Sequence, residues 1–226
     1  GRRIADAMRH PYSLIMINYS FGNLQLRRGE AGAATATFAG ALALCRDNEV
    51  HTMLPAIVAD FGLAQVMNGE LPAAMALLED ALDRQIYRSG GKYTHFFLLH
   101  AMGRACLAAG RSAMALACAG EADAVTRQSG EHAHRAYALK LLGDIQSELA
   151  DHAAAEANYA AAMALAEPRG MRPLLADCHY GLARLFAAGD DTRSRAEERL
   201  AFDLYGAMGI APPVFGKAAA SVAAGG

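Results

Sequence analysis

Side chains that could carry catalysis or bind a metal are few in this sequence, and their spacing keeps them apart. Cys178 and His179 are neighbours, but adjacent side chains on a helix diverge by about 100°, so a nucleophile and its base cannot meet this way. His132 and His134 would point about 200° apart on a helix and could not share one metal ion. Neither pair indicates an enzyme or a metal centre.

The other ionisable groups give no catalytic pattern either. His95 and His100 flank the segment FFLL, which lacks the glutamate that activates water in zinc proteases. Carboxylates near the end of the chain alternate with arginines, as on an exposed and salt-bridged helix face. This group comprises Asp190, Asp191, Arg193, Arg195, Glu197, Glu198 and Arg199. We therefore expect no catalytic residue, no metal, no cofactor and no enzymatic activity in this chain.

The composition indicates a helical chain that is long enough to bury a continuous core. Of its 226 residues 54% are apolar and 19% charged, and alanine dominates, which favours helix. A net charge of −2 gives no basic field for nucleic acid, and no stretch reaches the roughly 20 apolar residues of a membrane span. The cysteines (Cys45, Cys106, Cys118 and Cys178) have no metal-binding spacing and indicate buried thiols in a reducing cytoplasm.

A repeat with a period near 40 residues organises the sequence. Gly22 recurs as Gly62, Gly103 and Gly143, at spacings of 40, 41 and 40. Seven residues after each glycine comes a turn position, and two alanines follow at fixed distances. The turn residues are Gly29, Gly69, Gly110 and Ala150; the alanines are Ala34, Ala74, Ala115 and Ala155, then Ala41, Ala81, Ala122 and Ala162. A fixed period of this length is typical of a solenoid.

The physical meaning of the repeat is a helical hairpin. Small residues at matched heights let two antiparallel helices approach closely, and the glycine between them ends the first helix. Larger residues such as Phe38, Leu78 and Tyr159 are expected to fill the gap toward the next hairpin. A fifth, irregular unit keeps Gly189 and Ala201. Since no unit can bury this face alone, the stack is the stable structure.

These residues resemble the tetratricopeptide repeat (TPR), with a small residue at the eighth position, glycine at the fifteenth, and alanine at the twentieth and twenty-seventh. The resemblance implies an all-α, right-handed α-solenoid of about five TPR-like hairpins. The expected units are 15–54, 55–95, 96–135, 136–174 and 175–210. Residues 1–14 are expected to end a preceding repeat helix, and residues 211–226 to form a flexible tail.

Two segments sharpen the resemblance. HPYSLIMINYSFGNLQLRRGE near the start and GMRPLLADCHYGLARLFAAGD near the end are similar to the C-terminal repeats of bacterial class III adenylate cyclases with a STAND-type ATPase module, and to those of LuxR-type transcriptional regulators. In those families the catalytic and DNA-binding domains lie upstream of the repeats. This chain has no GxxxxGK[ST] motif, so their chemistry does not carry over to it.

In this repeat class the first helix of each hairpin lines the concave face, which defines the candidate partner-binding residues. They are Tyr19, Asn23, Arg27, Met67, Phe97, His100, Arg104, Tyr137, Lys140, Asp144 and Glu148. An apolar patch beside Arg27, Arg104 and Lys140 could hold a peptide by pairing with its acidic groups. The same side chains could equally be a solvated solenoid face that a neighbouring domain fills.

The expected function is therefore a non-catalytic interaction module within a multidomain bacterial signalling protein. Its partner would be a protein or peptide, including an upstream domain of the same polypeptide. The alternative is a free-standing TPR adaptor that binds a peptide in its groove. Self-assembly through the last unit is a further alternative, and it would use Leu200, Leu204, Tyr205 and Met208.

Overall fold

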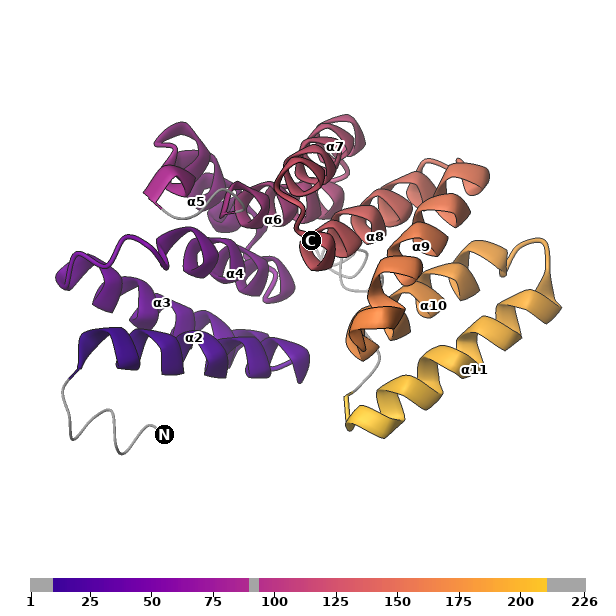
Figure 1. Ribbon diagram of the computed structural model, residues 1–226, viewed down its shortest axis with the longest axis horizontal. Coiled ribbons are helices and arrows are strands. Elements are labelled where there is room, and N and C mark those ends of the chain that lie inside the picture. Colours follow the sequence, from indigo (N-terminus) through magenta and orange to yellow (C-terminus); the bar gives the residue numbers. More distant parts are fainter. Residues whose placement is uncertain (1–9, 90–93, 211–226) are drawn as a thin grey trace, which may run out of the picture.

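The computed structural model describes residues 10–89 and 94–210, and this part of the chain is an all-α solenoid without strands. Antiparallel hairpins follow one another along a curved arc, with α2 and α11 at its two ends (Figure 1). The hairpins are α2 (Pro11–Arg27) with α3 (Ala31–Asp47), α4 (Leu54–Met67) with α5 (Leu71–Asp83), α6 (Thr94–Ala108) with α7 (Ser112–Ser129), α8 (His132–Glu148) with α9 (His152–Ala166), and α10 (Arg172–Phe186) with α11 (Asp191–Met208). Short 3₁₀ segments, Ile86–Ser89 and Glu167–Arg169, follow α5 and α9.

The start of the first helix differs from the prediction. Residues 11–14 belong to α2 and not to a preceding helix, because Pro11 opens it at a position that tolerates proline and His10 caps it. The His10 Nδ1 atom accepts the Ser13 backbone N–H at 3.4 Å. Residues 1–9 and the expected tail, 211–226, lie outside the described residues. No described helix is both long and apolar enough to cross a bilayer.

The turns inside the hairpins use left-handed backbone, as the glycines at these positions indicate. Gly29, Gly69 and Gly110 have φ values of 75°, 82° and 69°. In the first turn the Glu30 N–H also donates to the Gln25 carbonyl at 2.9 Å, which satisfies a carbonyl at the helix end. Ala150 takes the same conformation, with φ at 59°, although a Cβ atom makes it costly.

The recurring glycines of the first helices lie against side chains of neighbouring helices. A Cβ atom on Gly22 would lie 2.7 Å from the Phe38 ring, and one on Gly62 would lie 3.0 Å from Leu78. In the third hairpin a Cβ atom on Gly103 would lie 2.9 Å from Leu141 of α8, while the nearest atoms of the second helix, from Ala115 and Cys118, are 3.5 Å away. Glycine is therefore required here for space and not for backbone freedom.

Tyr159 joins the fourth and fifth hairpins in the same way. A Cβ atom on Gly143 would lie 2.9 Å from its ring, and one on Gly181 would lie 2.6 Å from its Cζ atom. The ring is 2% exposed, and its hydroxyl donates to Asp144 at 2.8 Å. One aromatic side chain thus fills two glycine notches on successive first helices.

Both ends of the described solenoid expose large apolar side chains. On α11, which is also rich in charged residues, Leu200 and Phe202 are 46% and 44% exposed. On α2, Phe21 and Leu24 are 43% and 50% exposed. The residues that match Leu24 in the next helices, two after each glycine, are fully buried; they are Ala64, Ala105 and Ile145.

Replacing Gly181 with alanine should destabilise the fold, because the new methyl group would collide with a buried and hydrogen-bonded tyrosine ring. We expect Gly181→Ala to lower the free energy of unfolding by about 1–3 kcal/mol. The matched control is Gly40→Ala in α3, where a Cβ atom meets nothing within 4 Å and should stabilise the helix by about 0.5–1 kcal/mol. Urea unfolding of both variants checks this, and equal midpoints would contradict it.

Replacing Ala150 with glycine should stabilise the protein, because glycine adopts a positive φ without steric cost. We expect Ala150→Gly to raise the free energy of unfolding by about 1 kcal/mol. Ala160→Gly, at an exposed site inside α9, should instead lower it by about 0.5–1 kcal/mol. Thermal unfolding followed by circular dichroism measures both, and a shift of the same sign in the two variants would contradict the assignment.

Candidate functional site

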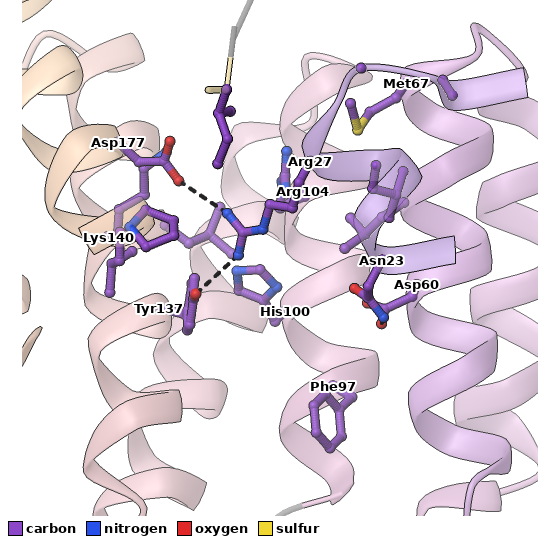
Figure 2. A pocket seen from close by; sticks show the side chains of 18 of the residues that line it. Asn23, Arg27, Asp60, Met67, Phe97, His100, Arg104, Tyr137, Lys140 and Asp177 are labelled. Atoms are coloured by element: carbon purple, nitrogen blue, oxygen red, sulfur yellow. Dashed lines mark hydrogen bonds and ion pairs between the residues drawn. The ribbon is translucent and has the colours of Figure 1, made fainter. Parts of the chain in front are cut away.

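The inner surface of the arc encloses a cavity of about 680 Å³ that the first helices line. These helices bring together side chains that lie more than 100 residues apart in the sequence (Figure 2). Ten of the eleven candidate residues line the cavity: Tyr19, Asn23, Arg27, Met67, Phe97, His100, Arg104, Tyr137, Lys140 and Asp144. The predicted first-helix positions therefore lie on one continuous surface.

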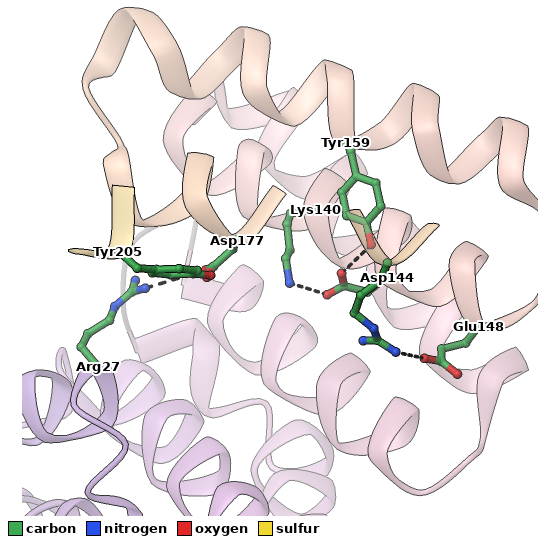
Figure 3. Close-up of polar contacts among 8 residues, drawn as sticks. Arg27, Lys140, Asp144, Glu148, Tyr159, Asp177 and Tyr205 are labelled. Atoms are coloured by element: carbon green, nitrogen blue, oxygen red, sulfur yellow. Dashed lines mark hydrogen bonds and ion pairs between the residues drawn. The ribbon is translucent and has the colours of Figure 1, made fainter. Parts of the chain in front are cut away.

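Glu148 is the one candidate that does not line the cavity. It is the last residue of α8, where its carboxylate pairs with Arg184 of α10 at 3.4 Å (Figure 3). Both side chains are about half exposed, so the pair is a surface contact between two hairpins. The structure therefore places Glu148 in a contact with the next hairpin and outside the cavity lining.

Two of the three predicted cations are already paired with carboxylates. Lys140 Nζ lies 2.6 Å from Asp144 Oδ2, and the same carboxylate accepts the Tyr159 hydroxyl (Figure 3). Arg27 donates to the Tyr137 hydroxyl at 3.1 Å and lies 4.0 Å from Asp177. Burial lowers the pKa of Lys140, but the Asp144 and Asp177 carboxylates together outweigh this effect and the net shift is upward. The expected free basic flank is thus largely neutralised.

Arg104 differs from these two cations. The structure gives its guanidinium no hydrogen bond or ion pair with any described residue. Burial lowers its pKa, while the more distant carboxylates Asp144 and Asp177 oppose that shift. A guanidinium offers several N–H donors and stays charged in proteins. Arg104 is therefore the cation in this cavity that is left to meet a ligand.

The sequence reasoning missed two carboxylates of the cavity, Asp60 and Asp177. Asp60 accepts a hydrogen bond from the Asn23 side chain at 2.9 Å, and burial raises its pKa. Asp177 of α10 accepts the Tyr205 hydroxyl of α11 at 2.5 Å. Asp60 comes directly after Ala59, the residue of α4 that occupies the same repeat position as Tyr19, and the fifth unit is out of register. A search for carboxylates beside the predicted repeat positions would have found Asp60 and Asp177.

His100 is a neutral member of the cavity wall. Burial, together with the nearby Arg104, Lys140, His134 and Arg27, lowers its pKa to about 3. Its ring stacks on Phe96, with ring centroids 5.3 Å apart. His100 can therefore give a ligand an uncharged hydrogen-bonding ring beside an aromatic surface.

The residues considered for chemistry do not form reactive groupings. Cys178 is fully buried, and burial raises its thiol pKa to about 12, which disfavours a thiolate. The His179 Nδ1 atom lies 2.6 Å from Glu197 on α11, away from the neighbouring thiol. No group of three or more potential metal ligands occurs within the described residues. The arrangement can bind a ligand through hydrogen bonds, ion pairs and apolar contacts.

The neutral state of His100 should make stability depend on pH. The unfolded chain takes up this proton below about pH 6.5 and the folded chain only near pH 3, so stability should fall as pH falls through this window, by up to about 1.4 kcal/mol per pH unit. His100→Gln should reduce the slope. Asp60 has the opposite effect on the pH dependence of stability, because its folded pKa is raised, and this effect is present in the parent and in His100→Gln. Urea unfolding between pH 4 and 7 tests this, and identical slopes would contradict it.

Comparisons with known proteins identify the architecture. No protein-family model matches the chain, and no curated protein matches it in sequence. Among solved structures, BtubC (BKLC) from P. vanneervenii is similar, with a TM-score of 0.60, 18% identity, and coverage of 96% of this chain and 90% of that one. The nearly identical TPR-like repeats assigned to a kinesin light chain of Podosopora anserina give a TM-score of 0.57 at 17% identity, with 88% and 98% coverage. At these identities the likeness establishes the fold, a TPR-like α-solenoid.

Proposed function

We propose that this chain is a protein-interaction module whose concave cavity binds a segment of a partner protein that carries an acidic group. The observation that carries the proposal is Arg104, a guanidinium in the cavity without a hydrogen-bond or ion-pair partner among the described residues. A carboxylate of the partner would satisfy it, because arginine and carboxylate form charge-assisted hydrogen bonds. The cavity volume of about 680 Å³ lies in the range typical of ligand sites.

The walls of the cavity support a peptide as the ligand. Leu26, Leu63 and Met67 provide apolar surface on the first two hairpins, and Met67 is 45% exposed. An extended or helical segment could bury an apolar side chain there while its acidic side chain reaches Arg104. Arg104 is held on α6, the middle first helix of the described arc.

The carboxylates of the cavity make a basic ligand less suitable. Asp144 and Asp177 each lie beside a cation and also accept a tyrosine hydroxyl. Asp60 accepts the Asn23 amide. A basic ligand would have to displace these partners, whereas an acidic ligand pairs with a group that has none. This difference favours acidic segments.

We further propose that the module works in a multidomain bacterial signalling protein of the cyclase or STAND-ATPase kind, in the cytoplasm. This rests on the sequence resemblance of its first and last repeat segments. Phe21 and Leu24, exposed on α2, give such a protein an apolar surface against which another domain can pack.

Selection from a displayed library of random peptides tests the binding role. We expect the parent protein to enrich peptides that contain Asp or Glu. Arg104→Gln should weaken their binding by roughly 10- to 100-fold, since a hydrogen bond to a charged group contributes about 1.5–3 kcal/mol. The matched control is Arg199→Gln on α11, where the arginine is exposed and 3.9 Å from Asp203.

Two results would contradict the proposal. One is a selection that enriches no acidic peptide, and the other is equal binding of the selected peptides by the parent and Arg104→Gln. Arg104→Gln is preferred to a charge reversal because a new carboxylate beside Asp144 and Asp177 would repel them. Circular dichroism of each variant confirms that the helices remain folded.

A further inference from the structure

Arg27 connects the first hairpin of the arc to the fourth and fifth. It is the last residue of α2, and its guanidinium donates to the Tyr137 hydroxyl of α8 at 3.1 Å. The same side chain lies 4.0 Å from the Asp177 carboxylate of α10. These contacts span 110 and 150 residues of sequence. Figure 3 shows Arg27 reaching from the α2 end of the arc to Asp177 and Tyr205.

The acceptors of Arg27 are held in place by neighbouring side chains. Tyr205 of α11 donates its hydroxyl to Asp177 at 2.5 Å. The Tyr137 ring meets the His100 ring edge-on, with ring centroids 6.2 Å apart. Arg27 itself sits where α2 ends, and a cation is stabilised at a helix C-terminus. The contact therefore joins groups whose positions are already fixed on each side.

Little else joins the two sides of the arc in the described part of the chain. Along its length α2 packs against α3 and, more lightly, α4, while it has no extensive packed interface with α8, α10 or α11. A solenoid is held by contacts between neighbouring repeats, so its curvature can change by small rotations at each interface. A single polar contact between distant hairpins can then select one curvature out of several.

We propose that Arg27 is an electrostatic latch that holds the arc closed around the cavity, and that its release from Asp177 and Tyr137 opens the arc. Arg27, Tyr137 and Asp177 all line the cavity, so a closed latch narrows the path into the site. The side chains of Arg27 and Asp177 are 42% and 24% exposed, so salt can screen the pair. An acidic ligand could also compete with Asp177 for Arg27.

The latch makes access to the cavity adjustable. An exposed ion pair together with one charge-assisted hydrogen bond shifts a two-state equilibrium by roughly 5- to 30-fold. Such a bias keeps the arc mostly closed at low ionic strength without locking it. The closure itself is independent of any ligand, whereas its role as a gate rests on the proposed function of the cavity.

Small-angle X-ray scattering of the unliganded protein tests the latch. We expect Arg27→Gln and Asp177→Asn to increase the radius of gyration and the maximum dimension at low salt. In 1 M NaCl, where the Debye length is about 3 Å, the parent should expand toward the Arg27→Gln values, and Arg27→Gln should change little. Because no ligand is present, the outcome is separate from the peptide selection.

The matched control is Arg28→Gln, which removes the same charge one residue away. Arg28 pairs with Glu30 of its own hairpin at 3.6 Å, so this variant should scatter like the parent. Asp177→Asn keeps an oxygen that can accept the Tyr205 hydroxyl, and unchanged circular dichroism at 222 nm confirms folding. If both latch variants scatter like the parent at low salt, or if Arg28→Gln expands as they do, the latch is wrong.

Discussion

Close contact between helices at the glycines of the first helices is the constraint on which the structure depends. At Gly22, Gly62, Gly143 and Gly181 a side chain from a neighbouring helix occupies the space that a Cβ atom would need. These notches fix the height at which the two helices of a hairpin meet, and Tyr159 extends the principle across a hairpin boundary. Since side-chain packing in cores is dense, such contacts leave few alternative registers.

The cavity follows from this packing. Once the hairpins stack in one register, equivalent positions of the first helices face the same inner space, and whatever polar groups they carry are forced together. Arg27, Lys140, Asp144 and Asp177 then lie close enough to interact. Burial of like charges would be unfavourable, and the interleaving of arginine, lysine and aspartate keeps most of them paired. Arg104 is the exception, since its guanidinium has no hydrogen-bond or ion-pair partner among the described residues.

The sequence was sufficient to predict the hairpins and most of the cavity wall, because both depend on local periodicity. Glycine spacing located the notches and turns, and helix geometry placed Tyr19, His100 and Tyr137 on the inner face. The TPR-like solenoid fold is confirmed by the described helices and the similar solved structures.

The sequence could not predict the contacts that depend on accumulated curvature. The pairing of Arg27 with Asp177 results from small rotations added over several hairpins, which no local pattern records. Asp60 and the irregular fifth unit depart from the predicted repeat positions for a related reason. A shift of one residue along a helix rotates the side chain by about 100°. In the third hairpin, Leu141 takes the role that a second-helix side chain has elsewhere. This exchange became visible only in three dimensions.

Tyr159 has a consequence for how the protein comes apart. Its ring belongs to a core cluster that runs from α8 to α10, while the larger cluster of the earlier hairpins ends on α8 at Leu141 and Ile145. A solenoid can lose terminal repeats one at a time when each interface is independent. Here the last hairpin cannot detach without exposing the part of the Tyr159 ring that packs against Gly181. The fourth and fifth hairpins should therefore unfold as one cooperative unit, with α8 as the boundary between two foldons.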